Sequence, residues 1–379
     1  MNGKLFIVVN VDRFFLSHRK EIALKAKQDG WDVTIVTADT GMLKEITSLG
    51  LKAINLPMSR SGMNLIQELR TLFFLIKLYR REKPNIVHHV GMKTILWGTL
   101  AAKYVNIWGV VNAISGLGGF FADDARDNIL VKMVIKILKI SHNRKNLLCI
   151  FQNDEDKALY IRNNIIRESQ ARYIKGSGVN LDEYSYSPEP SGGKIIVVLT
   201  ARMIVEKGVF ILIDAANLLR ERYDNKIEFQ LIGGIDDHPG AITKDQLEIA
   251  CDNKYIKWLG FRTDVKDLLR KCHIVAFPSY YMEGLPKSLI EACAIGRPII
   301  TCNSVGCKDA VIDGYNGFLI PIKDSYSLAQ KIESLLNNPE LRHQMGINGR
   351  RYAEKWFSID LVIKQHLAIY TELMTLCKR

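Results

Sequence analysis

Short apolar strand patterns alternate with helical patterns along almost the whole chain, and this alternation limits the possible folds more than any other feature. In the first half the strand-like runs include KLFIVVN, DVTIVTA, NIVHHVG and GVVNAIS. In the second half they are IIVVLTA, EFQLIGG, YIKWLGF, HIVAFPS and PIITCN. Such alternation implies parallel sheets covered by helices, which bind ligands beyond the carboxyl ends of their strands. The sequence therefore predicts an α/β protein.

A linker rich in Pro, Ser and Gly, SYSPEPSGGK, separates the two series at residues 185–194. A chain of 379 residues is too long for one ordinary core. We therefore expect two doubly wound, Rossmann-like domains with a cleft between them. Their expected ranges are 1–186 and 187–359, and a last helix at about 360–379 is expected to pack back on the first domain.

The charge balance points to an anionic partner. The chain has 52 Lys and Arg residues against 40 Asp and Glu, a net charge of +12. This excess suits nucleic acid, a phosphorylated small molecule or an acidic membrane surface, and also a soluble enzyme with a basic surface. No nucleic-acid partner is expected, because the basic residues do not gather on one recognition element with interleaved aromatic residues.

Cysteines and apolar segments place the chain in a reducing compartment without a membrane span. The seven cysteines are scattered and form no C-x-x-C pair, so reduced, buried thiols are expected. The N-terminal run MNGKLFIVVNVDRFF is typical of a strand and not of a signal peptide. Residues 94–121 are strongly apolar, but Lys103 interrupts them, and so do Gly109, Gly116, Gly118 and Gly119. They predict a buried helix, a strand and a Gly-rich loop.

Two helical segments of the first half, residues 68–83 and 127–145, combine bulky apolar residues with Lys and Arg. In the second segment an apolar stripe is flanked by lysines: Val131, Val134, Ile135 and Leu138 beside Lys132, Lys136 and Lys139. The composition suits a helix lying in an anionic bilayer surface. It equally suits an amphipathic helix packed on its own sheet with solvated lysines. The first alternative predicts a cytoplasmic protein that is peripheral on the inner face of the cytoplasmic membrane.

In the second half, two cations follow the strand pattern IIVVLTA. Arg202 and Lys207 lie in RMIVEKG, at the strand's carboxyl end and just before a helix. An Arg fork and a Lys point charge are well suited to a diphosphate. Taken alone, the pair is also what a solvated sheet edge contains.

Two carboxylates occupy unusual places in PSYYMEGLPKSLIEACAIGRPII, residues 278–300. Glu283 lies in a Gly/Pro loop, and Pro286 suits the first position of the helix that follows. Glu291 lies inside that apolar helix, where a carboxylate is costly unless something pairs with it. Gly296 and Pro298 mark the end of the helix.

The combination R-x4-K with E-G-L-P-x4-E resembles the nucleotide-sugar-dependent glycosyltransferases of family 4, the retaining group with the GT-B fold. The resemblance extends over GSGVNLDEYSY, LTARMIVEKG, LGFRTDVKDLL and AFPSYYMEGLPKSLIEACAIGRPIITCNSVGCKDAVIDGYNGFLIP, and into GINGRRYAEKWFS. In the first half, FFLSHRKEIALKAKQDGWDV, SGLGGFF and FQNDED look like the bacterial branch that builds lipid-linked surface polysaccharides.

The resemblance implies a role for each motif residue on the donor side. Arg202 and Lys207 would hold the donor's diphosphate and stabilise its growing charge. Glu283 would contact the transferred sugar, and Glu291 would accept hydrogen bonds from the ribose, which supplies the partner that its position demands. The remaining expected donor contacts are Gly233, Phe261, Arg262, Gly284, Leu285 and Pro286.

On the acceptor side the implied residues are Arg13, His18, His89, Lys93, Gly116 and Gly118. A histidine after a strand can equally be structural. The chain also departs from the family at VNVDRFF, where many relatives carry a Gly-Gly loop after the first strand. Donor contacts from residues 10–13 are therefore in doubt, although the charge of Arg13 could substitute.

No metal or other cofactor is expected. The letters D-E-D in NDEDK, residues 153–157, could suggest Mg²⁺. They follow a strand and begin a helix, so Asn153 or Asp154 is better interpreted as a helix N-cap. Arg202 and Lys207 also supply the charge compensation that a metal would give.

These features predict a retaining, α-linkage-forming glycosyltransferase. It would move an N-acetylhexosamine or hexose from a UDP-sugar to a polyprenyl-diphosphate-linked glycan of the O-antigen or capsule type. A covalent intermediate on Glu283 stays open. The alternatives are a GT-B-fold UDP-sugar epimerase and a non-catalytic membrane-associated partner with a vestigial donor site.

Overall fold

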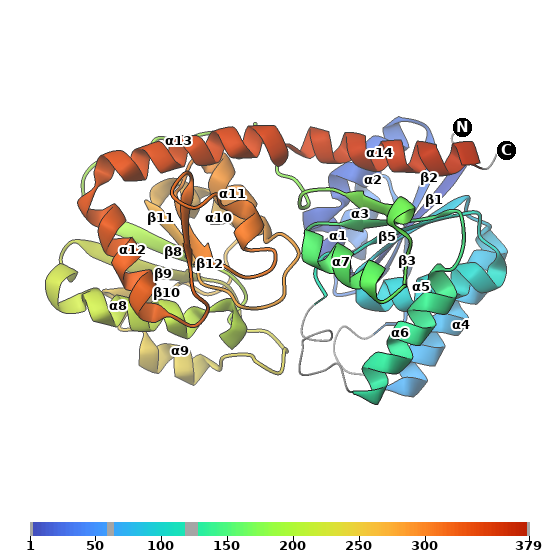
Figure 1. The fold of residues 1–379 in the computed structure, drawn as a ribbon, viewed down its shortest axis with the longest axis horizontal. Coiled ribbons are helices and arrows are strands. Elements are labelled where there is room, and N and C mark those ends of the chain that lie inside the picture. Colours follow the sequence, from blue (N-terminus) through green and yellow to red (C-terminus); the bar gives the residue numbers. More distant parts are fainter. Residues whose placement is uncertain (1–2, 59–63, 118–127, 377–379) are drawn as a thin grey trace. The chain divides into compact units, whose positions relative to one another are not determined.

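The computed structural model describes residues 3–58, 64–117 and 128–376. They form two compact units, residues 1–177 with 359–379 and residues 178–358 (Figure 1). The second unit therefore begins at residue 178, whereas the sequence analysis placed the boundary after residue 186. The reason is that the residues just before the linker are bonded into the second unit: Val179 N–H donates to the Phe357 carbonyl (2.8 Å), and Arg350 donates to the Tyr184 carbonyl (2.9 Å).

The first unit is built around a seven-stranded sheet in the order β3-β2-β1-β4-β5-β6-β7, in which every neighbouring pair is parallel. Its strands are β1 (Gly3–Val11), β2 (Trp31–Ala38), β3 (Lys52–Asn55), β4 (Ile86–Val90), β5 (Gly109–Ala113), β6 (Leu147–Phe151) and β7 (Ala171–Tyr173). Its helices are α1 (Asp12–His18), α2 (Lys20–Gln28), α3 (Leu43–Ser48), α4 (Leu65–Glu82), α5 (Met92–Val105), α6 (Ile129–His142), α7 (Asp154–Arg162) and α14 (Ile359–Leu376).

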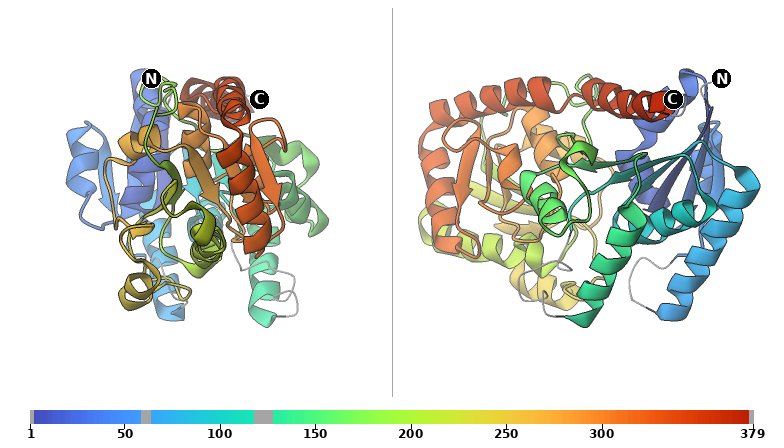
Figure 2. Two further views of the ribbon diagram at one scale, coloured as in Figure 1. Left: turned by 90° about the vertical axis from the view of Figure 1, so that its left-hand side faces the viewer. Right: turned by 45° about the vertical axis from the view of Figure 1, so that its right-hand side comes forward.

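Both faces of this sheet are covered by helices, because its strands are apolar on both sides. Along β1, Phe6 and Val8 join the core under α4, α5 and α6, whereas Leu5 and Ile7 join the core under α2 and α14. Figures 1 and 2 show these two helical layers on opposite sides of the sheet. The closing helix α14 packs on the first unit through α2 and β5.

The second unit is built around a six-stranded parallel sheet in the order β10-β9-β8-β11-β12-β13. Its strands are β8 (Ile195–Thr200), β9 (Ile227–Ile232), β10 (Ile256–Trp258), β11 (Ile274–Phe277), β12 (Ile299–Cys302) and β13 (Gly317–Ile320). Its helices are α8 (Val209–Tyr223), α9 (Lys244–Ala250), α10 (Val265–Lys271), α11 (Lys287–Ile295), α12 (Ser325–Asn337) and α13 (Pro339–Trp356).

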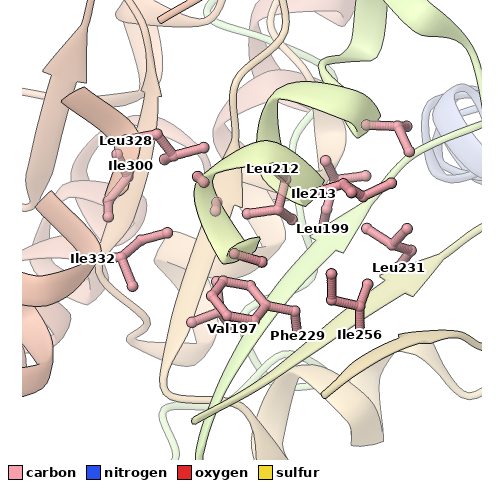
Figure 3. Packing of buried hydrophobic residues seen from close by; sticks show 14 of the residues in the cluster. Val197, Leu199, Leu212, Ile213, Phe229, Leu231, Ile256, Ile300, Leu328 and Ile332 are labelled. Carbon is pink, nitrogen blue, oxygen red and sulfur yellow. The ribbon is translucent and has the colours of Figure 1, made fainter. Parts of the chain in front are cut away.

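The core of the second unit fixes β8 between two helical layers. Val197 and Leu199 belong to the same cluster as Leu212 of α8 (Figure 3). Val198 belongs to the cluster on the opposite face of the sheet. Burying a side chain such as Leu199 contributes about 2 kcal/mol. The sheet edge after β8 is thereby placed on a rigid support. The expected pair of doubly wound α/β sheets is confirmed.

Two further predictions are confirmed. Residues 94–117 contain most of α5 and all of strand β5, whereas the rest of the expected Gly-rich loop lies outside the described residues. No helix in the described ranges is long and apolar enough to cross a membrane. The six described cysteines are unpaired and buried.

Candidate active site

The predicted donor residues leave two neighbouring strands where the order of the second sheet reverses. β8 lies beside β11, while β9 continues the sheet on the other side of β8. Val198 is in register with Val275, so β8 and β11 end at the same level. In open α/β sheets, ligands bind in the crevice that opens at such a switch point. The segment with Arg202 and Lys207 therefore meets the loop with Glu283 at one sheet edge.

Lys207 and Glu283 form an ion pair at this edge. Their side chains are only 10% and 14% exposed, so the pair is largely shielded from water. The Ser279 hydroxyl donates to the same carboxylate oxygen (3.3 Å), and the Lys207 ammonium lies 5.3 Å from the centre of the Tyr281 ring. The structure thus brings together one predicted cation and one predicted acid from opposite sides of the switch point.

Two glycines allow the loops around this pair to pack backbone to backbone. Gly208 has φ +80°, and a Cβ there would lie 2.2 Å from the Pro278 carbonyl oxygen. Gly306 has φ +81°, and its Cβ would lie 1.6 Å from the Gly284 carbonyl oxygen. Any other residue would displace these loops, since both positions are left-handed and closely packed. The glycines hold the Glu283 loop from both sides.

Arg202 is held by an acid that the sequence analysis did not assign. Its guanidinium donates to Asp236 (2.9 Å), a largely buried residue in the loop after β9, whose other oxygen accepts from the His238 N–H (3.0 Å). From this loop the sequence analysis names Gly233 alone. The available signal was an acid just beyond the strand that neighbours β8, because the carboxyl ends of parallel neighbours meet at one edge.

Glu291 lies in the second turn of α11, and protein groups already offset its burial. The Lys287 ammonium lies 3.8 Å from the carboxylate, and the Tyr184 hydroxyl hydrogen-bonds to it. Burial nevertheless raises the pKa of the Glu291 carboxyl above its usual range. The sequence argument assumed that a ligand is the only partner of Glu291, and the structure corrects this. Like Asp236, Tyr184 is a residue that the sequence argument missed.

The other expected donor contacts surround the same edge. Gly233 follows β9, and a Cβ there would lie 1.6 Å from the Ala201 carbonyl oxygen. Phe261, after β10, is strongly exposed. Arg262 forms an ion pair with Asp264 (2.6 Å).

The Gly284-Leu285-Pro286 turn is buried and leads into α11. Pro286 is the N-cap, so the helix begins at Lys287, one residue later than predicted, and it ends at Gly296 as expected.

The first unit places three of the predicted acceptor residues at the carboxyl edge of its sheet. Arg13 follows β1 and is exposed, Lys93 follows β4, and Gly116 follows β5 with φ +97°. Lys93 is held by Glu68 of α4 (2.6 Å). His18 ends α1, where its ring stacks on Phe14 with centroids 4.2 Å apart. Gly118 lies outside the described residues.

The expectation that His89 contacts sugar or acceptor is wrong. The side chain is completely buried in β4, and its two ring nitrogens lie 2.9 Å from the Tyr79 hydroxyl and 2.9 Å from Asn112 Oδ1. Burial lowers the pKa of His89 to about 4. His89 is therefore a neutral structural histidine that joins β4 to α4 and β5.

The helix-cap interpretation of residues 153–157 is confirmed. The Asn153 side chain accepts from the Asp156 N–H (2.7 Å) at the start of α7. Within the described ranges, no three His, Cys, Asp or Glu side chains are grouped so that they could hold a metal ion.

Comparisons with known proteins agree with this geometry. Residues 182–352 match the family Glycosyl transferases group 1, and residues 4–153 match Glycosyl transferase 4-like. The chain is 29% identical over 365 residues (93% of each chain) to the Campylobacter jejuni N,N'-diacetylbacillosaminyl-diphospho-undecaprenol alpha-1,3-N-acetylgalactosaminyltransferase. It is 25% identical over 360 residues (91% of this chain, 90% of the relative) to the Escherichia coli UDP-Gal:alpha-D-GlcNAc-diphosphoundecaprenol alpha-1,3-galactosyltransferase.

Solved structures share the fold over the whole chain. A glycosyltransferase from Rickettsia africae gives a TM-score of 0.78 at 21% identity and covers 99% of both chains. The Anabaena HepE protein in complex with UDP gives a TM-score of 0.78 at 17% identity and covers 97% of this chain and 100% of that one.

Proposed function

Because the chain belongs to the glycosyltransferases, with a group 1 domain and a glycosyltransferase-4-like domain, we propose that it transfers a sugar from a UDP-sugar to a glycan on a polyprenyl diphosphate. The transferred sugar is a hexose or N-acetylhexosamine, and the new linkage is α with retention. Two relatives carry names of α-1,3-transferases that act on diphospho-undecaprenol-linked sugars, which supports this acceptor class.

The Lys207–Glu283 pair at the β8–β11 switch point is the observation that carries the proposal. Transfer breaks the bond between the sugar C1 and a phosphate oxygen, so negative charge grows on the departing diphosphate. Lys207 and Arg202 stabilise that charge, an effect typically worth about 3–4 kcal/mol for one well-placed group. Asp236 and Glu283 hold the two cations in place until the donor arrives.

Glu283 acts on the sugar as a polar contact and not as a nucleophile. One of its oxygens is occupied by the Lys207 ammonium and the Ser279 hydroxyl. Two charge-stabilising donors on one oxygen make a carboxylate less nucleophilic, since they stabilise the negative charge that an attack would use. The acceptor oxygen attacks C1 from the face that the phosphate leaves, and the departing phosphate oxygen takes its proton.

The reaction needs no metal, because Arg202 and Lys207 compensate the diphosphate charge. Glu291 binds the ribose hydroxyls from the second turn of α11. The protein works at the inner face of the cytoplasmic membrane, where a polyprenyl-linked acceptor is held.

The test is to offer a panel of UDP- and GDP-sugars with a polyprenyl-diphosphate-linked saccharide and to measure which nucleotide is released, with and without EDTA. We expect UDP release in both, and an α-configured product by NMR. Lys207→Ala should lower UDP release by about 10²–10³-fold, whereas Lys254→Ala, at an exposed position, serves as the matched control and should leave release unchanged. UDP release that needs no acceptor, or a β-configured product, would contradict the proposal.

A further inference from the structure

We propose that the starts of α4 and α6 form a docking surface for an anionic lipid bilayer. This surface, called here the two helix tips, consists of Leu65, Ile66 and Leu69 on α4 and of Ile129, Leu130 and Met133 on α6. The inference deepens the proposed function, since a lipid-linked acceptor would be met at such a surface, but its evidence comes from the first unit alone.

The two helix tips lie at one edge of the first unit. α4, α5 and α6 follow β3, β4 and β5 of a parallel sheet, so all three helices start at the carboxyl edge. α5 contacts both neighbours and lies between them. Figures 1 and 2 show the starts of α4 and α6 projecting to the same side of this unit. Lys93 at the start of α5 forms an ion pair with Glu68 of α4. This pair connects the start of α4 to the carboxyl edge of the sheet, where the predicted acceptor residues lie.

The side chains of the two helix tips are exposed to a degree that is unusual for large apolar residues. All six are 40–79% exposed. Clusters of exposed apolar residues on soluble proteins mark protein or membrane contacts.

The charge around the two helix tips favours the bilayer over a protein partner. A groove of about 590 Å³ beside α6 is rimmed by Lys132, Lys136, Lys139 and Arg162, and no acid is among its described lining residues. A second groove of about 580 Å³ on α4 is lined by Arg70, Phe73 and Lys77 among others. The charged residues among its described lining are again all cations. Surfaces whose charged residues are all cations attract anionic lipid headgroups.

The excess charge of the whole chain belongs to the first unit. Residues 1–177 and 359–379 contain 30 Lys and Arg against 17 Asp and Glu, whereas residues 178–358 contain 22 against 23. The net positive charge therefore lies entirely on the unit that carries the two helix tips.

The structure also corrects which face of α6 would meet lipid. Val131 and Leu138 of the stripe singled out in the sequence are buried in the core of the first unit, and Val134 and Ile135 pack against that core. That stripe holds the helix to its own protein, as the second sequence interpretation had it. The bilayer is met by the start of the helix and by Lys132, Lys136 and Lys139, which rim the groove beside it.

Vesicle sedimentation tests the proposal on the full chain. We expect binding to phosphatidylglycerol-containing vesicles and little binding to phosphatidylcholine alone. Each basic residue near an anionic surface contributes about fivefold. K132Q/K136Q/K139Q should therefore weaken vesicle binding roughly 100-fold. The control variant K244Q/K254Q/K271Q, which replaces three exposed lysines of the second unit, should bind vesicles like the wild type.

Insertion is tested separately from charge. L65S/I66S and L130S/M133S should each weaken binding at least tenfold, whereas Ile249→Ser, at an equally exposed apolar position on α9, should not. In Leu130→Trp, brominated lipids should quench fluorescence beyond the wild-type level, and in Ile249→Trp they should not. Equal binding to both vesicle types, or equal effects of tip and control variants, would overturn the proposal.

The outcome can be separated from that of the proposed function. The tip variants should keep wild-type UDP release with an acceptor dissolved in detergent and lose it with the same acceptor in vesicles. Vesicle binding without any transferase activity would leave the docking surface standing and remove the proposed reaction. Activity in vesicles that is unaffected by the tip variants would remove the docking surface alone.

Discussion

Lys207→Ala should damage folding and catalysis by different amounts, because the lysine both neutralises a shielded acid and faces the leaving group. The substitution leaves the Glu283 carboxylate, 14% exposed, without its cation. Removing one partner of a buried pair costs about 3–5 kcal/mol. Because some solvent reaches both side chains, we expect about 3 kcal/mol of lost unfolding free energy. The same substitution should lower kcat by about 10²–10³-fold, the range for removing one charge-stabilising group.

A second substitution separates the two effects. Glu283→Gln added to Lys207→Ala replaces the stranded carboxylate with a neutral amide of the same shape, so the unfolding free energy should return to within about 1 kcal/mol of wild type. Turnover should not return, because the diphosphate still lacks its cation.

Urea unfolding followed by circular dichroism, together with UDP release, measures both quantities. The matched control is the Lys257–Glu228 pair (2.8 Å), which joins β10 to β9. Lys257→Ala should leave kcat unchanged. The reasoning would be refuted if Lys207→Ala were as stable as wild type, or if the double variant recovered turnover.

Three further outcomes are expected. Glu291→Gln should weaken UDP binding about tenfold, as measured by calorimetry. Because burial raises the Glu291 pKa, UDP binding to the wild type should also weaken as the pH falls toward that pKa. An equal loss of UDP affinity with falling pH in the variant would contradict the ribose role. Gly306→Ala should cost several kcal/mol of unfolding free energy and reduce turnover, since its Cβ would meet the Gly284 carbonyl; full activity would show that the loop is not held there. Stability should fall below about pH 6.5, because the buried histidines of the first unit have folded-state pKa values below that of the unfolded chain. Unfolding then takes up protons, so the free energy of unfolding falls by about 1.4 kcal/mol per pH unit for each of these histidines. A denaturation midpoint that stays constant between pH 7.5 and 5 would refute this. The histidines are His88 (pKa well lowered), His89 (about 4), His142 (about 3) and His366 (about 3).

The donor edge could be predicted because its position follows from chain order. Arg202 and Glu283 come directly after strands whose apolar runs are unmistakable, and parallel strands gather their carboxyl ends at one edge. Local loop geometry was not encoded in the same way. The pairing of Asp236 with Arg202 and of Tyr184 with Glu291 depends on how two loops fold back, which no periodicity reports.

Burial of single residues was the other limit. NIVHHVG shows two histidines in a strand, but the alternation of faces cannot show that both faces of that strand are covered. His88 and His89 are in fact both fully buried, on opposite faces of β4. For α6, the stripe that sequence periodicity marks is the buried one, and only the structure identifies the exposed residues at the start of the helix.

The structure of the protein with UDP bound would test the account most directly. We expect the diphosphate oxygens within hydrogen-bonding distance of Arg202 and Lys207, with Glu283 and Asp236 displaced from or sharing these cations, and the ribose hydroxyls on Glu291. A nucleotide bound away from the carboxyl ends of β8 and β11, or one that leaves both cations on their acids without touching them, would contradict it.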